Sequence, residues 1–346
     1  MLQPFGPATT GRTSGAKMSG ASMSGTSTSW TRALAAALLW LAVFAAGAAS
    51  HAQTADPGPP FVLKELAPGV WAAIDRGGRA GANAGFVIGD DGVAVIDSFY
   101  RPEAAPALLA EIRKLTPLPI RYVINTHYHI DHVAGDNTFT SAGALVVAQR
   151  NVRGWIHSEN LKFFGPEPKP EQKALVAGLA APEILVDHDL ILYLGARRLE
   201  LKAWPGHTGG DLAIAVPDAK VVFCGDLLWR RTSPNLIDAT VSQWTQTLDA
   251  WAHAPGAQAL AYVPGHGDVA TLADMADFRG YLQDVSDTVR KETAVGLAGD
   301  ALAKASLEAL SPKYGAWDGF SRMAPREIPL MAAELAGTKR VPQPAE

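Results

Sequence analysis

The chain has 346 residues, of which 48% are hydrophobic and 18% are charged, and its formal net charge at neutral pH is −4. This composition is typical of a globular protein, and the mildly acidic balance argues against nucleic acid as a partner, which requires a basic surface. The single cysteine, Cys224, excludes an internal disulfide, and we predict that its side chain is buried and inert.

The first 52 residues have the features of a secretory leader. Residues 1–29 are rich in Ser, Thr, Gly and Ala and contain no acidic residue, which predicts a disordered n-region. The apolar run 33–49 follows, and the small residues Ser50 and Ala52 occupy the positions that a signal peptidase reads. This run is shorter than the roughly 20 residues of a membrane span. The sequence therefore predicts a signal peptide, cleavage after Ala52 and a periplasmic or secreted protein.

Removal of residues 1–52 deletes three basic residues and no acidic residue, so the formal balance changes from 30 − 34 = −4 to 27 − 34 = −7. The mature chain has no basic cluster that would hold it at a membrane surface. We therefore expect no stable membrane association after cleavage, no nucleic-acid partner and a small-molecule substrate. The oligomeric state and the true start codon, among Met1, Met18 and Met23, stay open.

After a Pro/Gly-rich linker at residues 53–60, short apolar runs alternate with turn residues and with helical patterns. The expected strands and hairpins are 61–67, 70–74, 86–88, 93–96, 121–125, 144–148, 190–204, 211–217, 220–226 and 259–267. The expected helices are 101–115, much of 150–178, 242–254 and most of the chain after 271.

Strands that alternate with helices favour α/β layers, and the hairpins argue against a purely parallel sheet. We therefore predict one compact α/β domain over residues 61–270, with helices outside two mixed sheets. Residues 271–346 are predicted to form C-terminal helices that pack on this domain.

A cluster of histidines follows the expected strand 121–125 directly. The spacing His127-x-His129-x-Asp131-His132 places four polar side chains within six residues, which indicates a metal site. Three later strands also run into loops that present a polar ligand. Together the four segments supply seven nitrogen or oxygen donors and no thiolate: His127, His129, Asp131, His132, His207, Asp226 and His266.

Imidazole and carboxylate ligands are typical of zinc, but seven protein ligands exceed what one tetrahedral ion takes. They suit two ions about 3.5–4 Å apart, as in two-metal hydrolases. In an extended loop, alternation places His127 and His129 on one side, and Asp131 with His132 can reach a second ion. We predict that Asp97, at the end of an earlier strand, is structural and holds the ligand loop by hydrogen bonds.

At these motifs the chain resembles the metallo-β-lactamase superfamily. The residues that carry the resemblance are THYHIDH, PGHTGGD, FCGDLLW and VPGHGDV, with VAVIDS before them. The resemblance implies a four-layer αβ/βα sandwich with the metals at one edge, between the two sheets. It also implies the roles of the donors: His127, His129 and His207 for a first zinc, Asp131, His132 and His266 for a second, and Asp226 as the bridge.

Different features of the chain resemble different groups within the superfamily. The segment SPNLIDATVSQWTQTL is similar to true β-lactamases and implies that Asn235 lies near the substrate. Cysteine-using β-lactamases, however, have a thiolate in place of Asp226 and a lysine in place of Trp229. Arg230 is adjacent to Trp229 and is a second candidate for substrate binding. The bridging aspartate is more similar to thioester and lactone hydrolases. Exported zinc hydrolases of quinoprotein and sulfur-oxidation systems share the leader and the helical tail.

The resulting hypothesis is a dinuclear zinc hydrolase that opens a β-lactam, an ester or lactone, or a thioester with a metal-bridging hydroxide. Asp131 is its predicted catalytic residue, because it can orient the attacking water as well as bind metal. The alternatives are a zinc hydrolase of a periplasmic quinoprotein or sulfur-oxidation pathway and a non-catalytic metal module. Export and the acidic net charge argue against a phosphodiesterase. Iron-based redox members of the superfamily usually have a glutamate at the position of His129, which argues against that group as well.

Overall fold

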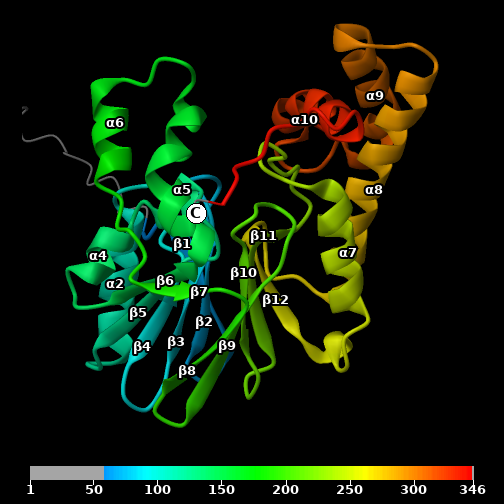
Figure 1. Ribbon diagram of the computed structural model, residues 1–346. Coiled ribbons are helices and arrows are strands. Elements are labelled where there is room, and N and C mark those ends of the chain that lie inside the picture. Colours follow the sequence, from blue (N-terminus) through cyan, green and yellow to red (C-terminus); the bar gives the residue numbers. More distant parts are fainter. Residues whose placement is uncertain (1–57, 345–346) are drawn as a thin grey trace, which may run out of the picture. The chain divides into compact units, whose positions relative to one another are not determined.

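The computed structural model describes residues 58–344 (Figure 1). The predicted n-region and signal peptide, the cleavage after Ala52 and most of the predicted linker lie outside the described residues. Within residues 58–344, none of the helices combines the length and the apolar character that a membrane crossing requires.

The first sheet has seven strands that lie side by side in chain order. Strands β1 to β4 pair antiparallel, and β4 to β7 pair parallel. Gly69, with a φ of +75°, makes the tight turn from β1 to β2, and the predicted turn at residues 90–92 joins β3 to β4. The strands are β1 Phe61–Ala67, β2 Val70–Asp75, β3 Ala84–Ile88, β4 Val93–Ile96, β5 Ile120–Ile124, β6 Leu145–Gln149 and β7 Ile184–Val186.

The second sheet has five strands in the order β12-β11-β10-β9-β8. Its neighbours pair antiparallel, except for β11 and β12, which are parallel. The strands are β8 Asp189–Leu194, β9 Arg197–Ala203, β10 Leu212–Val216, β11 Val221–Trp229 and β12 Ala261–His266.

The two sheets face each other across an apolar core, as Figure 1 shows. Val87, Ile96 and Val147 of the first sheet belong to the same buried cluster as Ile214 and Val263 of the second. Because side chains alternate between the faces of a strand, the other face of each sheet is free to pack against helices.

Helices cover both outer faces and complete four layers (Figure 1). On the first sheet they are α2 Ala104–Leu115 and α4 Asp136–Thr140, and on the second sheet α7 Val241–Ala252, α8 Leu272–Ala294, α9 Gly299–Tyr314 and α10 Phe320–Leu335. Shorter elements are α3 Ile130–Val133, α5 Arg150–Ser158, the 3-10 helix η1 Asn160–Phe164, α6 Pro170–Ala177 and the 3-10 helix η2 Ala257–Ala259. The predicted α/β sandwich with a helical C-terminal region is confirmed.

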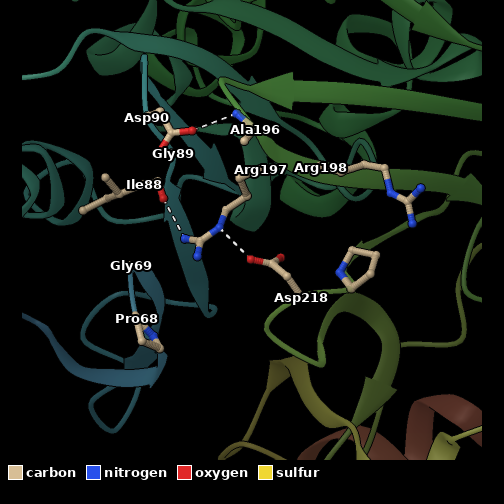
Figure 2. Close-up of a pocket in the computed structure, with 10 residues that line it drawn as sticks. Pro68, Gly69, Ile88, Gly89, Asp90, Ala196, Arg197, Arg198 and Asp218 are labelled. Atoms are coloured by element: carbon tan, nitrogen blue, oxygen red, sulfur yellow. Dashed lines mark hydrogen bonds and ion pairs between the residues drawn. The ribbon is translucent and has the colours of Figure 1, made fainter.

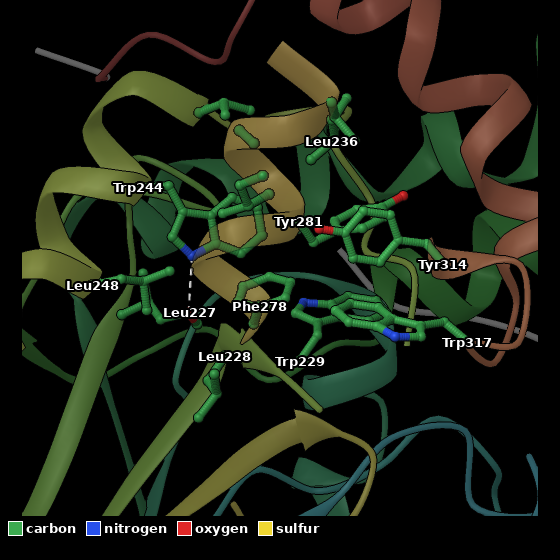
Figure 3. Close-up of a cluster of buried hydrophobic side chains, with 14 of the residues drawn as sticks. Leu227, Leu228, Trp229, Leu236, Trp244, Leu248, Phe278, Tyr281, Tyr314 and Trp317 are labelled. Carbon is green, nitrogen blue, oxygen red and sulfur yellow. Dashed lines mark hydrogen bonds between the residues drawn. The ribbon is translucent and has the colours of Figure 1, made fainter. Parts of the chain in front are cut away.

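The C-terminal helices share one aromatic core with the second sheet. Figure 3 shows Trp244 of α7, Phe278 and Tyr281 of α8, and Trp317 after α9 within this cluster. Tyr281 and Trp317 are stacked with ring centroids 5.0 Å apart. Helix α8 begins at a capping box, in which the Thr271 hydroxyl accepts from the backbone N–H of Asp274. Phe320 and Ile328 of α10 belong to the same buried cluster as Trp229 of β11, so α10 packs onto this core.

Candidate metal centre

The structure brings all seven predicted donors together at one edge of the sandwich. They form two groups, and within each group the ligand atoms lie within 4.8 Å of one another. The first group is His127, His129, His207 and Asp226, and the second is Asp131, His132 and His266.

Asp226 on β11 lies between the two groups and turns one carboxylate oxygen to each. Its Oδ2 is 3.8 Å from His127 Nε2 and 3.2 Å from His207 Nε2. Its Oδ1 is 3.2 Å from His132 Nε2 and 3.5 Å from His266 Nε2. This placement suits a carboxylate that binds two adjacent cations.

The buried donor atoms also lack the partners that buried polar atoms normally have. Within residues 58–344, His127 Nε2, His132 Nε2, His266 Nε2 and Asp226 Oδ1 have no aligned hydrogen-bond partner. His207 Nε2 and His129 Nδ1 face each other at 3.0 Å, a contact that places two lone pairs together unless a cation or a proton lies between them. The donor set therefore fits bound metal ions.

Asp97 orients the second group from behind. Its carboxylate accepts hydrogen bonds from Thr126 N at 2.7 Å and Thr126 Oγ1 at 2.8 Å, and it lies 2.9 Å from His132 Nδ1. Asp97 adopts a left-handed φ of +57°, which is uncommon outside glycine. Because Nδ1 of His132 is held by this carboxylate, Nε2 is the nitrogen directed to the site.

Asp238 has the same relation to the first group, and sequence reasoning missed it. Its Oδ2 is 3.0 Å from His129 Nε2 and also accepts from the Tyr128 hydroxyl. Lys162 of η1 donates to Oδ1 at 2.7 Å. The pair His129 and Asp238 is separated by 109 residues, so no local spacing could reveal it. Its only signal was its place in the segment that resembles β-lactamases.

The charges of the first group suit cation binding. Burial lowers the pKa of His207 to about 3 and that of His127 well below its usual value, so both imidazoles are neutral at neutral pH. Burial opposes ionisation of Asp226, but His132, His266 and His207 outweigh it and lower the pKa of that carboxyl. Neutral imidazole and ionised carboxylate are the forms that bind metal.

The second group holds an excess of negative charge around His132. Burial works to lower the pKa of His132, but the carboxylates of Asp226, Asp131 and Asp97 raise it well above its usual value. The pKa of Asp131 is lowered, against the effect of burial, by His132 and His266. Without a cation, a proton on His132 offsets the surrounding carboxylates.

Small and aromatic residues pack directly against the donor side chains. A Cβ at position 265 would lie 1.9 Å from Asp226 Oδ1, so only glycine fits beside the bridging carboxylate. The Trp244 ring lies 5.2 Å from that of His207, and its Nε1 donates to Leu227 O at 2.9 Å (Figure 3). Trp229 stacks on His266 at 4.0 Å.

A cavity of about 360 Å³ opens beside the second group and is lined by Asp131 and His266. Asn235 also lines it, as do Arg322 and Met323 of α10. The structure does not bring Arg230 to this cavity, because Arg230 Nε donates to Asp274 at 2.9 Å. Of the two predicted substrate contacts, only Asn235 therefore borders the cavity.

A second cavity, of about 420 Å³, contains none of the predicted donors (Figure 2). It lies among hairpin turns, where Arg197 donates to Ile88 O at 2.7 Å and to Asp218 at 3.1 Å. Asp90 accepts from Ala196 N. These charged groups are already paired, so this cavity offers less available chemistry than the one beside Asp131.

Cys224 takes no part in the site although it lies two residues before Asp226. Its side chain is buried, and burial raises the pKa of the thiol. Its nearest polar partner is Val222 O at 3.6 Å. The thiol is therefore unreactive at neutral pH.

Comparison with known proteins places this geometry in context. The model of the metallo-beta-lactamase superfamily matches residues 77–266, more than half of the chain. A hydroxyacylglutathione hydrolase of Mesorhizobium japonicum is 29% identical over 48% of this chain and 55% of its own length. One of Gloeobacter violaceus is 29% identical over 49% of this chain and 59% of its own length. The match thus spans little more than half of these relatives.

Solved structures show the same fold at low identity. A metallo-beta-lactamase from Pontibacter korlensis superposes with a TM-score of 0.51 and 20% identity, over 64% of this chain and 99% of that one. The sec-alkylsulfatase from Pseudomonas sp. gives 0.54 and 19% identity, over 70% of this chain and 45% of that one. At such identities the likeness shows the fold alone.

Proposed function

Because the chain belongs to the metallo-β-lactamase superfamily, and is thus a metal-binding hydrolase, we propose that it is a dinuclear zinc enzyme that cleaves thioesters of small molecules. The observation that carries the proposal is the position of Asp226, whose two oxygens face two separate donor groups. One ion would be held by the first group and the other by the second, and Asp226 would contribute to both.

Two zinc ions, when bound, supply Lewis acidity toward the substrate carbonyl and the attacking water. Asp131 is the donor best placed to act on that water, because it is partly exposed and lines the cavity, with Oδ2 3.3 Å from His266 Nε2. Asp131 therefore orients the water through a hydrogen bond, while the water proton passes to the departing sulfur as the C–S bond breaks.

A thioester is favoured over the other carbonyl substrates for two reasons. The curated relatives are named hydroxyacylglutathione hydrolases. An aspartate, Asp226, also stands at the bridging position, where cysteine-using β-lactamases have a thiolate. β-Lactams and lactones are the competing substrates, and a non-catalytic metal module and a phosphodiesterase are the competing functions.

A substrate panel on zinc-loaded protein tests the proposal. Elemental analysis should find two zinc ions per chain, and a glutathione thioester should be hydrolysed, with the activity lost on chelation and restored by zinc. Turnover of nitrocefin or a lactone alone would replace the thioester with that substrate. Turnover of a phosphodiester reporter alone would indicate a phosphodiesterase, and no turnover of any substrate by metal-loaded protein would indicate a non-catalytic module.

We also propose that the enzyme acts in the periplasm or outside the cell. The support is the leader-like sequence that ends at Ala52. Mass spectrometry of the protein purified from a bacterial periplasmic fraction should give Gln53 as the first residue. An intact N-terminus in the cytoplasmic fraction would contradict export.

A further inference from the structure

We propose that Arg322, Trp229 and Asn235 form a subsite for a carboxylate group of the substrate, and that helix α10 thereby sets substrate specificity. The inference rests on the proposed function for the identity of the reacting bond. The cationic residue of the subsite, Arg322, lies on α10 and therefore outside residues 77–266, which the superfamily model matches, whereas Trp229 and Asn235 lie within them.

Arg322 brings a positive charge to the cavity beside Asp131. It is on the first turn of α10 and lines the same cavity as the metal donors Asp131 and His266. Within the described part of the chain, no carboxylate forms an ion pair with its guanidinium, whereas Arg230 and Arg279 are each paired with an aspartate. A guanidinium presents parallel N–H groups that match the two oxygens of a carboxylate.

Trp229 adds a buried donor that lacks a partner. Its side chain is only 6% exposed, yet Nε1 has no hydrogen-bond partner among residues 58–344. A buried indole N–H normally finds an acceptor. Trp229 lines the cavity and its Nε1 is itself buried, so an acceptor on the substrate would satisfy this group once a small shift of the indole brings Nε1 to the cavity.

Asn235 supplies a third donor. Its Oδ1 accepts from Ile237 N at 3.0 Å, which fixes the orientation of the amide, and Nδ2 donates to no residue of the described chain. Three residues that each carry a donor without an acceptor thus line one cavity. Such a set is complementary to an anion with several lone pairs, and a carboxylate matches it.

The carboxylates of the cavity do not compete equally for these donors. Asp75 already accepts from the backbone N–H groups of Gly78, Ala80 and Gly81. Asp318 is exposed at the rim and forms no ion pair among the described residues. Asp318 would therefore repel a substrate anion weakly, and its neutralisation should act in the direction opposite to the loss of Arg322.

The test compares two thioesters, S-acetyl-3-mercaptopropionate and its methyl ester, in which methylation removes the negative charge. The readout is the ratio of kcat/KM for the carboxylate to that for the ester. Arg322→Gln should lower this ratio roughly tenfold to a hundredfold, mainly through KM, and Arg322→Lys should restore part of it. Asp318→Asn should raise the ratio by about twofold.

Arg326→Gln is the matched control, because Arg326 is exposed on the same helix, one turn further on, and does not line the cavity. It should leave the ratio as in the wild type. An unchanged ratio in Arg322→Gln, or an equal fall in Arg326→Gln, would overturn the subsite.

Binding separates this inference from the proposed function. Calorimetric titration of the zinc-loaded protein with 3-(ethylthio)propionate, a thioether that cannot be hydrolysed, should give binding that its methyl ester lacks and that Arg322→Gln loses. If the wild type hydrolyses neither thioester but shows this pattern, the thioesterase proposal fails and the subsite stands. Equal affinity of the acid and the ester, or of the wild type and Arg322→Gln, overturns the subsite whatever the activity.

Discussion

The two donor groups differ most in their exposure. In the first group His127, His129, His207 and Asp226 are each at most 3% exposed. In the second group His132 is fully buried, but the side chains of Asp131 and His266 are 32% and 17% exposed and border the cavity. The first group is thus enclosed by protein, while the second meets solvent. An enclosed group favours permanent binding of metal, and an open one favours exchange and contact with substrate.

Asp226 is the residue that joins the two donor groups, so its removal should affect both of them. An effect on one group alone would contradict this description of the site. Asp226→Ala should lower kcat/KM by at least about a thousandfold, since it removes several kcal/mol of charge stabilisation at both ions. Zinc per chain, measured by elemental analysis, should fall below one. Asp218→Ala, on a distant exposed turn, should keep both values, and two retained zinc ions in Asp226→Ala would contradict the bridging role.

Substitution of Asp238 or Asp97, the carboxylates that orient the histidines, should weaken metal binding by one donor group at a time. Asp238→Asn removes the charge beside His129 and should weaken the first ion ten- to a hundredfold, because such partners raise the basicity of a ligand. Asp97→Asn should weaken the second ion by a similar factor through His132. Competition titration with a zinc chelator measures both constants. If either variant weakened both ions equally, the two groups would not be independent.

The pH dependence of binding should differ between the groups. The raised pKa of His132 means that the second ion must displace a proton, so its affinity should increase by up to about tenfold per pH unit between pH 6 and pH 8. His127 and His207 have lowered pKa values and are already neutral there. The first ion should therefore show little change over the same range. Parallel pH profiles of the two zinc dissociation constants would contradict this assignment.

The smallest effect is expected for Arg230, which sequence reasoning placed near the substrate. Its contacts with Asp274 at 2.9 Å and Asp268 at 3.7 Å are those of a partly exposed ion pair. Arg230→Ala should change kcat/KM by less than about twofold and stability by no more than about 1 kcal/mol. A tenfold rise in KM would show that this side chain reaches the substrate in solution.

The residues that the sequence predicted differ from those it missed in how far apart along the chain their contacts lie. The spacing from His127 to His132 is local, and each later donor follows a buried strand, so the sequence could indicate all seven. Asp238 meets His129, and Lys162 meets Asp238, only because the loop before α7 and the 3-10 helix η1 converge on the site. Arg322 belongs to a helix that was predicted, but its place at the cavity depends on how α10 packs against α8. Such packing has no periodic signal in a single sequence.

The donors are shared between the two halves of the sandwich. The donors from His127 to His132 follow β5 of the first sheet. Asp226 and His266 lie on β11 and β12 of the second sheet, and His207 lies in the loop between its strands β9 and β10. Any ion held by both sets acts as a staple across the sheets, and its binding energy adds to the free energy of unfolding. If the chain is exported, as we propose, then zinc supply in the surroundings would govern the resistance of this disulfide-free protein to proteases, and hence its lifetime.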